Sequence, residues 1–155
     1  MKAKDLMIPV DEYLHPETTL KQAVNRLRTM EQEKGKAGVK GLPVLDPQGM
    51  VIGMLSMNDI LKAVHPSYLN LMNLGDFTWD GMVEELAKKA AGRKIEDIMN
   101  RTVFAVKEND SLMECVDHMI KNCLLQLPVV NESGHVVGMI FERDVFYAVV
   151  KAILE

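Results

Sequence analysis

Apolar side chains recur at helical spacing in two stretches of the chain, and a hydroxyl residue opens each stretch. The first has one apolar face, made by Leu20, Ala23, Val24 and Leu27. The second has a similar face, made by Leu112, Val116, Met119 and Ile120. Thr19 with Gln22, and Ser111 with Glu114, have the spacing of a capping box, in which the hydroxyl and the longer side chain satisfy backbone N–H groups reciprocally. We therefore predict that two amphipathic helices begin at these caps.

Short apolar runs on either side of turn-forming residues predict two β-hairpins. The first hairpin pairs residues 42–45 with 51–55, and the second pairs residues 127–130 with 136–140. A helical pattern follows each hairpin, over residues 57–64 and 142–154. The predicted order in each half of the chain is short strand, helix, strand, strand, helix, which makes an α/β (α+β) fold.

The two halves are copies of one unit. Asp5-Leu6-Met7 recurs as Asp97-Ile98-Met99, and the capped helices follow at the same offset of 92 residues. Leu42-Pro43-Val44 recurs as Leu127-Pro128-Val129, and Asp59 as Asp144, at an offset of 85 residues. We therefore divide the chain into a first repeat (1–64), a connector (65–94) and a second repeat (95–155).

Two segments have no counterpart in the other repeat. The connector carries a predicted helix over residues 81–91 and an apolar cluster made by Tyr68, Leu69, Leu71, Met72, Phe77 and Trp79. Packing against the rest of the chain is the favoured interpretation of this cluster, and a partner surface is the alternative. Residues 31–41 carry Lys34, Lys36 and Lys40 among glycines, which favours a solvated loop over one that closes on a phosphate.

Composition and charge narrow the function classes. The net charge of −4, without a basic stripe, disfavours nucleic acid and acidic membranes as partners. The chain has no run of about 20 apolar residues, and Met1 is followed by polar residues rather than by a leader. Cys115 and Cys123 lie about 12 Å apart along one predicted helix, too far for a mutual disulfide. We expect a cytoplasmic protein in a reducing compartment.

The sequence contains no motif that indicates catalysis. The four histidines lack metal-ligand spacing, and neither a P-loop nor a G-x-G-x-x-G fingerprint is present. His118 lies beside the apolar face of its predicted helix, where a packed or surface histidine is commoner than a catalytic one. We therefore expect a protein that is not an enzyme and that requires no cofactor or metal.

The repeated pattern resembles a known family. Leu-Pro-Val, a turn and Gly-x-x-Ser-x-x-Asp, preceded by Asp-Leu/Ile-Met and a capped helix, is similar to the cystathionine β-synthase (CBS) domain pair, or Bateman module. The resemblance covers residues 3–64 and 95–153. It implies two repeats related by a pseudo-twofold axis, with their sheets packed face to face and clefts that take AMP, ADP, ATP or related adenosyl ligands.

The resemblance also implies a main ligand site in the motif of the first repeat. Asp59 would hold the ribose hydroxyls, and Ser56 would contact phosphate at a helix start. Asn58 and Met54 lie in the same motif, and the second repeat would add Asn100, Leu125 and Gln126. Elementary chemistry agrees, because a helix N-terminus attracts anions and a carboxylate accepts hydrogen bonds from hydroxyls. Ser56 serves equally well as a cap of its own helix, and the sequence leaves these two roles open.

The second repeat departs from the motif, because Phe141 replaces the hydroxyl residue. We therefore expect a weaker second site, made by Asp144, Arg143, Met139, Lys40 and Gly41. Arg143 could contact phosphate in place of the hydroxyl, or pair with an acidic neighbour at the surface.

Two function classes follow from these observations. The first is a regulatory module that binds an adenosine-type nucleotide and transmits its state to an effector protein. The second is a dimerisation or assembly module that needs no ligand. The resemblance implies a homodimer through the helices at 57–64 and 142–154 in either case.

Overall fold

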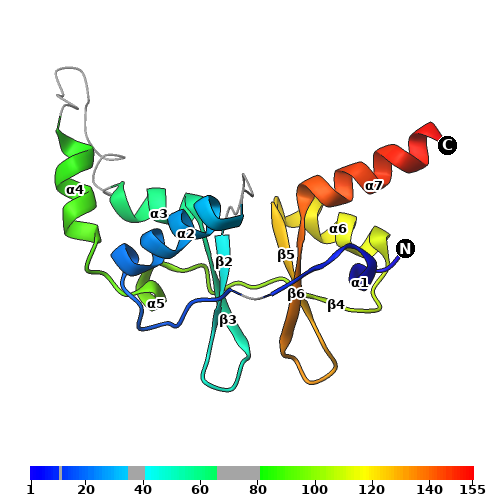
Figure 1. Cartoon of the computed structure of the whole chain (residues 1–155), viewed down its shortest axis with the longest axis horizontal. Helices are drawn as coiled ribbons and strands as arrows, with labels where there is room; N and C mark the ends of the chain where they lie inside the picture. The colour runs from blue at the N-terminus through cyan, green and yellow to red at the C-terminus, as the bar shows by residue number, and fades with distance from the viewer. Residues whose placement is uncertain (11, 35–40, 66–80) are drawn as a thin grey trace. The chain divides into compact units, whose positions relative to one another are not determined.

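The computed structural model describes residues 1–10, 12–34, 41–65 and 81–155. The chain contains both helices and strands, as Figure 1 shows, and the mixed α/β class predicted from the pattern is confirmed. Their bounds in chain order are α1 (Ala3–Leu6), β1 (Ile8–Pro9), α2 (Leu20–Lys34), β2 (Gly41–Leu45), β3 (Val51–Ser56), α3 (Met57–Val64), α4 (Met82–Ala90), α5 (Ile95–Ile98), β4 (Val106–Lys107), α6 (Leu112–Asn122), β5 (Gln126–Val130), β6 (Val136–Phe141) and α7 (Glu142–Leu154).

Helices α2 and α6 begin at the predicted capping boxes. The Gln22 side chain accepts a hydrogen bond from the Thr19 N–H at 3.0 Å, and the Thr19 hydroxyl accepts from the Gln22 N–H at 3.3 Å. Ser111 and Glu114 make the same pair of bonds at 2.6 and 3.2 Å. The hydrogen bonds from the backbone and hydroxyl of Ser111 lower the pKa of the Glu114 carboxyl, because they favour its charged form. Both predicted helix starts are confirmed.

The two hairpin turns have the same hydrogen bonds. Asp46 Oδ1 accepts from the N–H groups of residues 48 and 50, and Asn131 Oδ1 accepts from those of residues 133 and 135, all at 2.9 to 3.0 Å. Gly49 and Gly134 have φ values of 82° and 83°, a left-handed conformation that suits a residue without a Cβ. Each turn therefore closes for the same chemical reason, and both predicted hairpins are confirmed.

Two compact units make up the described chain, and we describe each by itself. Unit 1 consists of Met1–Tyr13, Leu45–Ile52 and Thr102–Glu155, and unit 2 of Leu14–Val44 and Gly53–Arg101. In unit 1, β1 pairs antiparallel with β6, β6 antiparallel with β5, and β4 parallel with β5. Its core contains Ala3, Val106, Cys115, Met119, Leu127, Val129, Ile140 and Val145.

Unit 1 also brings the two hairpin turns together. Met50 and His135 form an antiparallel bridge, and His135 Nε2 donates a hydrogen bond to the Gln48 carbonyl at 2.9 Å. The side chain of each bridging residue covers the turn glycine of the opposite hairpin, His135 over Gly49 and Met50 over Gly134.

Unit 2 contains α2, α3, α4 and α5 with most of the β2–β3 hairpin. The backbone joins α5 to the segment before α2, since the Ile95 N–H donates to the Thr18 carbonyl at 2.8 Å. Val44, Leu55 and Ile95 are fully buried. Helix α4 lies within the predicted range 81–91 and contacts α3. The apolar cluster at 68–79 and the lysines at 36 and 40 lie outside the described residues.

The compact units and the sequence repeats are different divisions of the chain. Met7, from the first repeat, lies on Gly138 in the second repeat's hairpin, and Met99, from the second repeat, lies on Gly53 in the first repeat's hairpin. Each Asp-Leu/Ile-Met segment therefore packs in the unit that holds the other repeat's helices. In Figure 1 the N-terminal segment, in dark blue, runs beside β6.

Helices α1 and α5 were not predicted from the pattern. Each has four residues, about one turn, which is too short for a helical period to appear in the sequence. The Asp5 carboxylate accepts a hydrogen bond from the Lys2 N–H at 2.8 Å, which explains an acidic residue at this place in the motif.

Candidate functional site

The junction of β3 and α3 in unit 2 holds the two residues with the strongest motif signal. Ser56 has extended backbone dihedrals and is the N-cap of α3. Asp59 Oδ2 accepts hydrogen bonds from the Ser56 N–H and hydroxyl, both at 2.8 Å, and the Ser56 hydroxyl accepts from the Asp59 N–H at 3.2 Å. Both side chains are half-buried. Ser56 is thus a cap in this structure, and among the described residues Asp59 Oδ1 has no hydrogen-bond partner.

Three more predicted residues lie close to this junction. Met54 and Asn100 form an antiparallel bridge in which each N–H donates to the other's carbonyl at 2.9 Å. Asn58 is exposed in the first turn of α3, one residue before Asp59. The structure therefore brings five predicted residues together in unit 2, and we call them the first set: Met54, Ser56, Asn58, Asp59 and Asn100.

Leu125 and Gln126, predicted for the same site, lie in unit 1. The Leu125 carbonyl accepts a hydrogen bond from the Glu142 N–H at 2.9 Å, and Gln126 lies opposite Phe141 in the β5–β6 ladder. Both residues therefore lie at the start of α7. Their role in the first site stays a prediction.

The start of α7 also holds most of the residues predicted for the second site. Arg143 and Asp144 are in the first turn of α7, and Met139 is buried in β6. Phe141 is the N-cap of α7 and makes no side-chain cap hydrogen bond. We call Met139, Arg143 and Asp144 the second set. Gly41 begins β2 and is buried in unit 2, while Lys40 lies outside the described residues.

Two acceptor atoms near the start of α7 are buried and have no hydrogen-bond partner among the described residues. They are Asp144 Oδ2 and Gln126 Oε1. The guanidinium Nε of Arg143 lies 3.9 Å from the other carboxylate oxygen, Oδ1. A contact of Arg143 with phosphate stays a prediction. A buried acceptor without a donor is uncommon in proteins and calls for a physical explanation.

Ile8 is a residue near the second set that the sequence interpretation missed. Ile8 is the bridge partner of Met139 in unit 1, as Asn100 is the bridge partner of Met54 in unit 2. The repeat offset already contained the signal, because Ile8 follows Asp-Leu-Met and Asn100 follows Asp-Ile-Met. The first set thus has an amide where unit 1 has a branched hydrocarbon.

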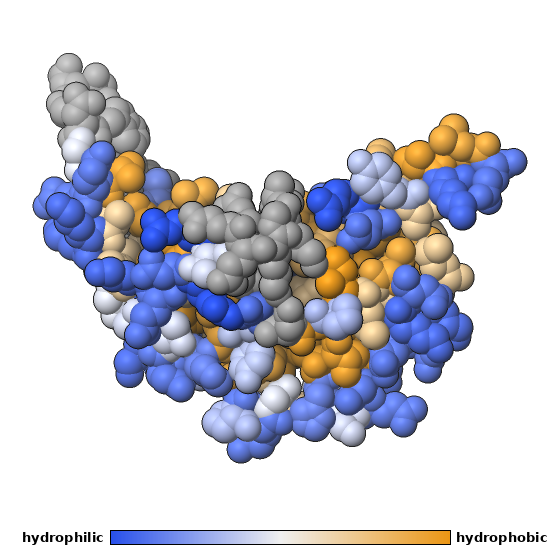
Figure 2. Space-filling model, viewed as in Figure 1, coloured by the Kyte–Doolittle hydropathy of each residue, from blue (hydrophilic) through white to orange (hydrophobic). Residues whose placement is uncertain are grey.

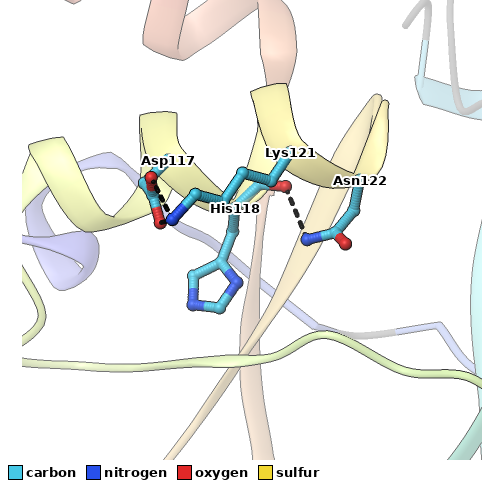
Figure 3. Close-up of polar contacts among 4 residues, drawn as sticks. All are labelled: Asp117, His118, Lys121 and Asn122. Carbon is cyan, nitrogen blue, oxygen red and sulfur yellow. Dashed lines mark hydrogen bonds and ion pairs between the residues drawn. The ribbon is translucent and has the colours of Figure 1, made fainter.

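His118 lies on α6 among polar and aromatic neighbours. Figure 3 shows its ring pointing away from α6, while Lys121 Nζ pairs with the Asp117 carboxylate at 2.9 Å and the Asn122 amide donates to the His118 carbonyl at 3.0 Å. The half-buried ring lies 6.4 Å from that of Phe104, centroid to centroid. Within the described parts of the chain, no group of three or more His, Cys, Asp or Glu side chains is placed to hold a metal ion.

Helix α7 exposes a large apolar surface. Only Val145 of this helix is buried, and Figure 2 shows apolar side chains toward its C-terminal end. The exposed apolar residues of α7 are Phe146, Tyr147, Val149, Ile153 and Leu154. In α3, Met57 and Leu61 are also exposed, one helical turn apart. Among the residues that the structure describes, no helix has the length and hydropathy needed to cross a membrane.

The CBS domain model matches two parts of the chain, residues 3–66 and 95–151. Over 128 residues, the chain is 30% identical to an uncharacterised protein of Methanocaldococcus jannaschii, and the alignment covers 74% of this chain and 76% of that protein.

Solved structures show the same fold. CBSX2 of Arabidopsis thaliana, in complex with AMP, has 22% sequence identity and a TM-score of 0.67, with 97% of each chain covered. The cytosolic domain of the Mg²⁺ channel MgtE, in complex with ATP, has 23% identity and a TM-score of 0.63, with 95% of this chain and 48% of that chain covered.

Proposed function

The chain belongs to the CBS domain family as a tandem CBS pair, a Bateman module, and on this premise we propose that it is a non-catalytic regulatory module that binds an adenosine-type nucleotide. The Ser56–Asp59 pair carries the proposal. It joins a hydroxyl donor, a carboxylate and a helix start at one place in unit 2. The complexes of CBSX2 with AMP and of the MgtE domain with ATP support the ligand class.

The hydrogen bonds of the first set suit the two ends of a nucleotide. Asp59 Oδ1 accepts from a ribose hydroxyl without disturbing the cap, because the cap uses Oδ2. The Ser56 hydroxyl donates to Asp59 in this structure, so it must turn toward the ligand before it donates to a phosphate. A phosphate near the first turn of α3 also gains from the helix dipole.

The nucleotide would regulate the module if it bound one conformation of the module more tightly than another. A ligand shifts a conformational equilibrium only by the difference in its binding free energy between the two states. We infer that an effector protein, or a second copy of the chain, responds to the conformation that the nucleotide favours.

Thermal unfolding with AMP, ADP and ATP tests this function. A ligand at about a hundred times its Kd adds roughly 2.7 kcal/mol to the free energy of unfolding, which raises Tm by about 5 to 10 °C for a chain of this size. We expect this shift with an adenine nucleotide, a smaller one with GMP, and none in Asp59→Ala, because the substitution removes the ribose acceptor.

The matched control is Ser111→Ala. Like Asp59→Ala it breaks a capping box, but it lies at α6 in unit 1. The control should therefore lower Tm through the lost cap, at a cost of about 1 kcal/mol, and keep the full nucleotide shift. An unchanged shift in Asp59→Ala would contradict the site, and no shift in the wild type with any nucleotide would favour assembly without a ligand.

The apolar surface of α7 supports the second candidate function, dimerisation. Three of its apolar side chains are largely exposed: Phe146 by 58%, Tyr147 by 62% and Ile153 by 75%. Contact of this much apolar surface with water is unfavourable in free energy. We propose that a second copy of the chain covers this surface, since closed twofold dimers are the commonest assemblies of soluble proteins.

Sedimentation of Ile153→Glu measures this dimerisation. The wild type is expected to sediment as a dimer, and the variant as a monomer, because a carboxylate in an apolar interface loses its hydration without gaining a partner. Ile120→Glu on α6 is the control, since Ile120 is 72% exposed on another helix, and it should leave the dimer intact. A wild-type monomer, or a dimer that survives Ile153→Glu, would rule out this interface.

A further inference from the structure

Helix α3 of unit 2 has an exposed apolar face, as α7 of unit 1 does. We propose that the exposed face of α7 binds α3 of a second copy of the chain, rather than α7 of that copy. Two such contacts, made reciprocally, close a twofold dimer. This inference rests on the dimerisation proposed above and assigns the two helices that meet.

The first step concerns the apolar side chains of the two helices. In α7, Phe146, Val149 and Ile153 are exposed and have the spacing of one helical face. In α3, Met57 and Leu61 are 56 and 67% exposed, one helical turn apart. Leu61 and Phe146 are equivalent positions of the repeat, at the offset of 85 residues. Each helix therefore offers apolar side chains that a partner helix can cover.

The second step is the difference in net charge between the two units. Among the described residues, unit 1 has six Lys or Arg and eleven Asp or Glu, a net charge of −5. Unit 2 has ten Lys or Arg and eight Asp or Glu, a net charge of +2. Contact between unit 1 of one copy and unit 2 of another therefore brings opposite charges together, whereas contact between two copies of unit 1 brings like charges together.

This difference in charge favours α3 over the other helices as the partner of α7. Helix α6 also exposes two apolar side chains, Met113 and Ile120, but it belongs to the negatively charged unit 1. Within the described part of unit 2, α3 has two large exposed apolar residues, and no other helix has more than one. The apolar surface and the charge thus point to the same helix.

The third step is a pair of charged side chains beside the two apolar faces. Glu142 precedes Phe146 by four residues, so it lies on the same side of α7, and Lys62 follows Leu61 in α3. Both charged side chains are exposed, and neither has an ion-pair partner among the described residues. The other charged residues near α7 lie within ion-pair distance of one another, Arg143 with Asp144 and Lys151 with Glu155. An α7–α3 contact brings a carboxylate and an ammonium group together, whereas contacts between like helices bring like charges together.

Sedimentation of mixed variants tests which helices meet. Phe146→Glu and Leu61→Lys each damage both contacts of the reciprocal dimer, so each variant alone should sediment as a monomer. In an equimolar mixture, each pair of copies keeps one undamaged contact, and the other contact holds a new carboxylate and a new ammonium group. We therefore expect the mixture to sediment as a dimer. The Tm of each variant shows whether it is folded.

The control is a mixture of Phe146→Glu with Leu61→Glu. It differs only in that the damaged contact holds two carboxylates, so it should dimerise at least about threefold more weakly than the mixture with Leu61→Lys. If like helices paired, residue 61 would never meet residue 146, and the two mixtures would behave alike.

Charge reversal at the native residues provides an independent check. Glu142→Lys should raise the Kd of the dimer about three- to tenfold, because each contact then holds two ammonium groups, and adding Lys62→Glu to the same chain should restore the Kd. Glu132→Lys is the matched control. It makes the same change of net charge in unit 1, in the exposed turn between β5 and β6, and should change the Kd less than about twofold.

Three results overturn the inference or the dimerisation separately. Two mixtures that dimerise equally contradict the contact between α7 and α3. A Glu142→Lys variant that dimerises as tightly as the wild type, or that Lys62→Glu does not restore, contradicts the charge pairing. If the wild type is a monomer, the proposed dimerisation fails, and this inference fails with it.

Discussion

Leu127→Ala is expected to lower the free energy of unfolding by about 2–5 kcal/mol. Leu127 is fully buried in β5, in the core that also contains Ile140 and Val145. The substitution removes the side-chain contacts of this residue and leaves a cavity that a close-packed core fills only in part. Urea denaturation followed by circular dichroism measures the change as a shift of the midpoint.

Ile120→Ala is the control for this prediction. It also shortens an apolar side chain in unit 1, but that side chain is 72% exposed on α6, so the expected change is within about 0.5 kcal/mol. Equal effects of the two substitutions would mean that the core is not centred on β5.

Gly138→Ala is expected to destabilise the protein by about 1–3 kcal/mol, and Met7→Ala should relieve much of that effect. A Cβ at residue 138 would lie 2.7 Å from the Met7 Sδ and 2.9 Å from its Cβ. Both distances are shorter than ordinary van der Waals contacts, so one of the groups would have to move. Because the two residues are in contact, the changes that the two substitutions make in the free energy of unfolding should not be additive. The double variant should be about 0.5–3 kcal/mol more stable than the sum of the two single changes predicts.

The same experiment at Gly53 shows which segments pack together. A Cβ at Gly53 would collide with the Met99 side chain, so Met99→Ala is the expected rescue of Gly53→Ala. The crossed combinations, Gly138→Ala with Met99→Ala and Gly53→Ala with Met7→Ala, should be additive, because those pairs lie in different units. Rescue in the crossed combinations instead would mean that each repeat packs only on itself. Denaturation midpoints of all eight variants and the wild type decide between the two arrangements.

Local chemistry explains why so much of the fold could be predicted. A capping box needs only residues three apart, so Thr19 and Ser111 could be identified as helix starts without knowledge of the fold. The hairpins have turns closed by Asp46 and Asn131 within four residues. Helix α4 fell within its predicted range because its period extends over nine residues.

The first set was easier to predict from the sequence than the surroundings of the second set. Ser56 and Asp59 are three residues apart, so their mutual hydrogen bonds follow from spacing. The sequence left the cap and ligand roles of Ser56 equal, and the structure shows the cap. Ile8 was overlooked, although the repeat offset places it at the position equivalent to Asn100.

The sequence by itself determined the elements, their order and the repeat, because these depend on periodicity and on contacts between near neighbours. Only the tertiary structure decided that Met7 packs on Gly138 and Met99 on Gly53, in place of the partners within their own repeats. The repeats carry the same residues at these positions, so either pairing matches the pattern equally well. The choice depends on the path of the chain in space, which local patterns in the sequence do not specify.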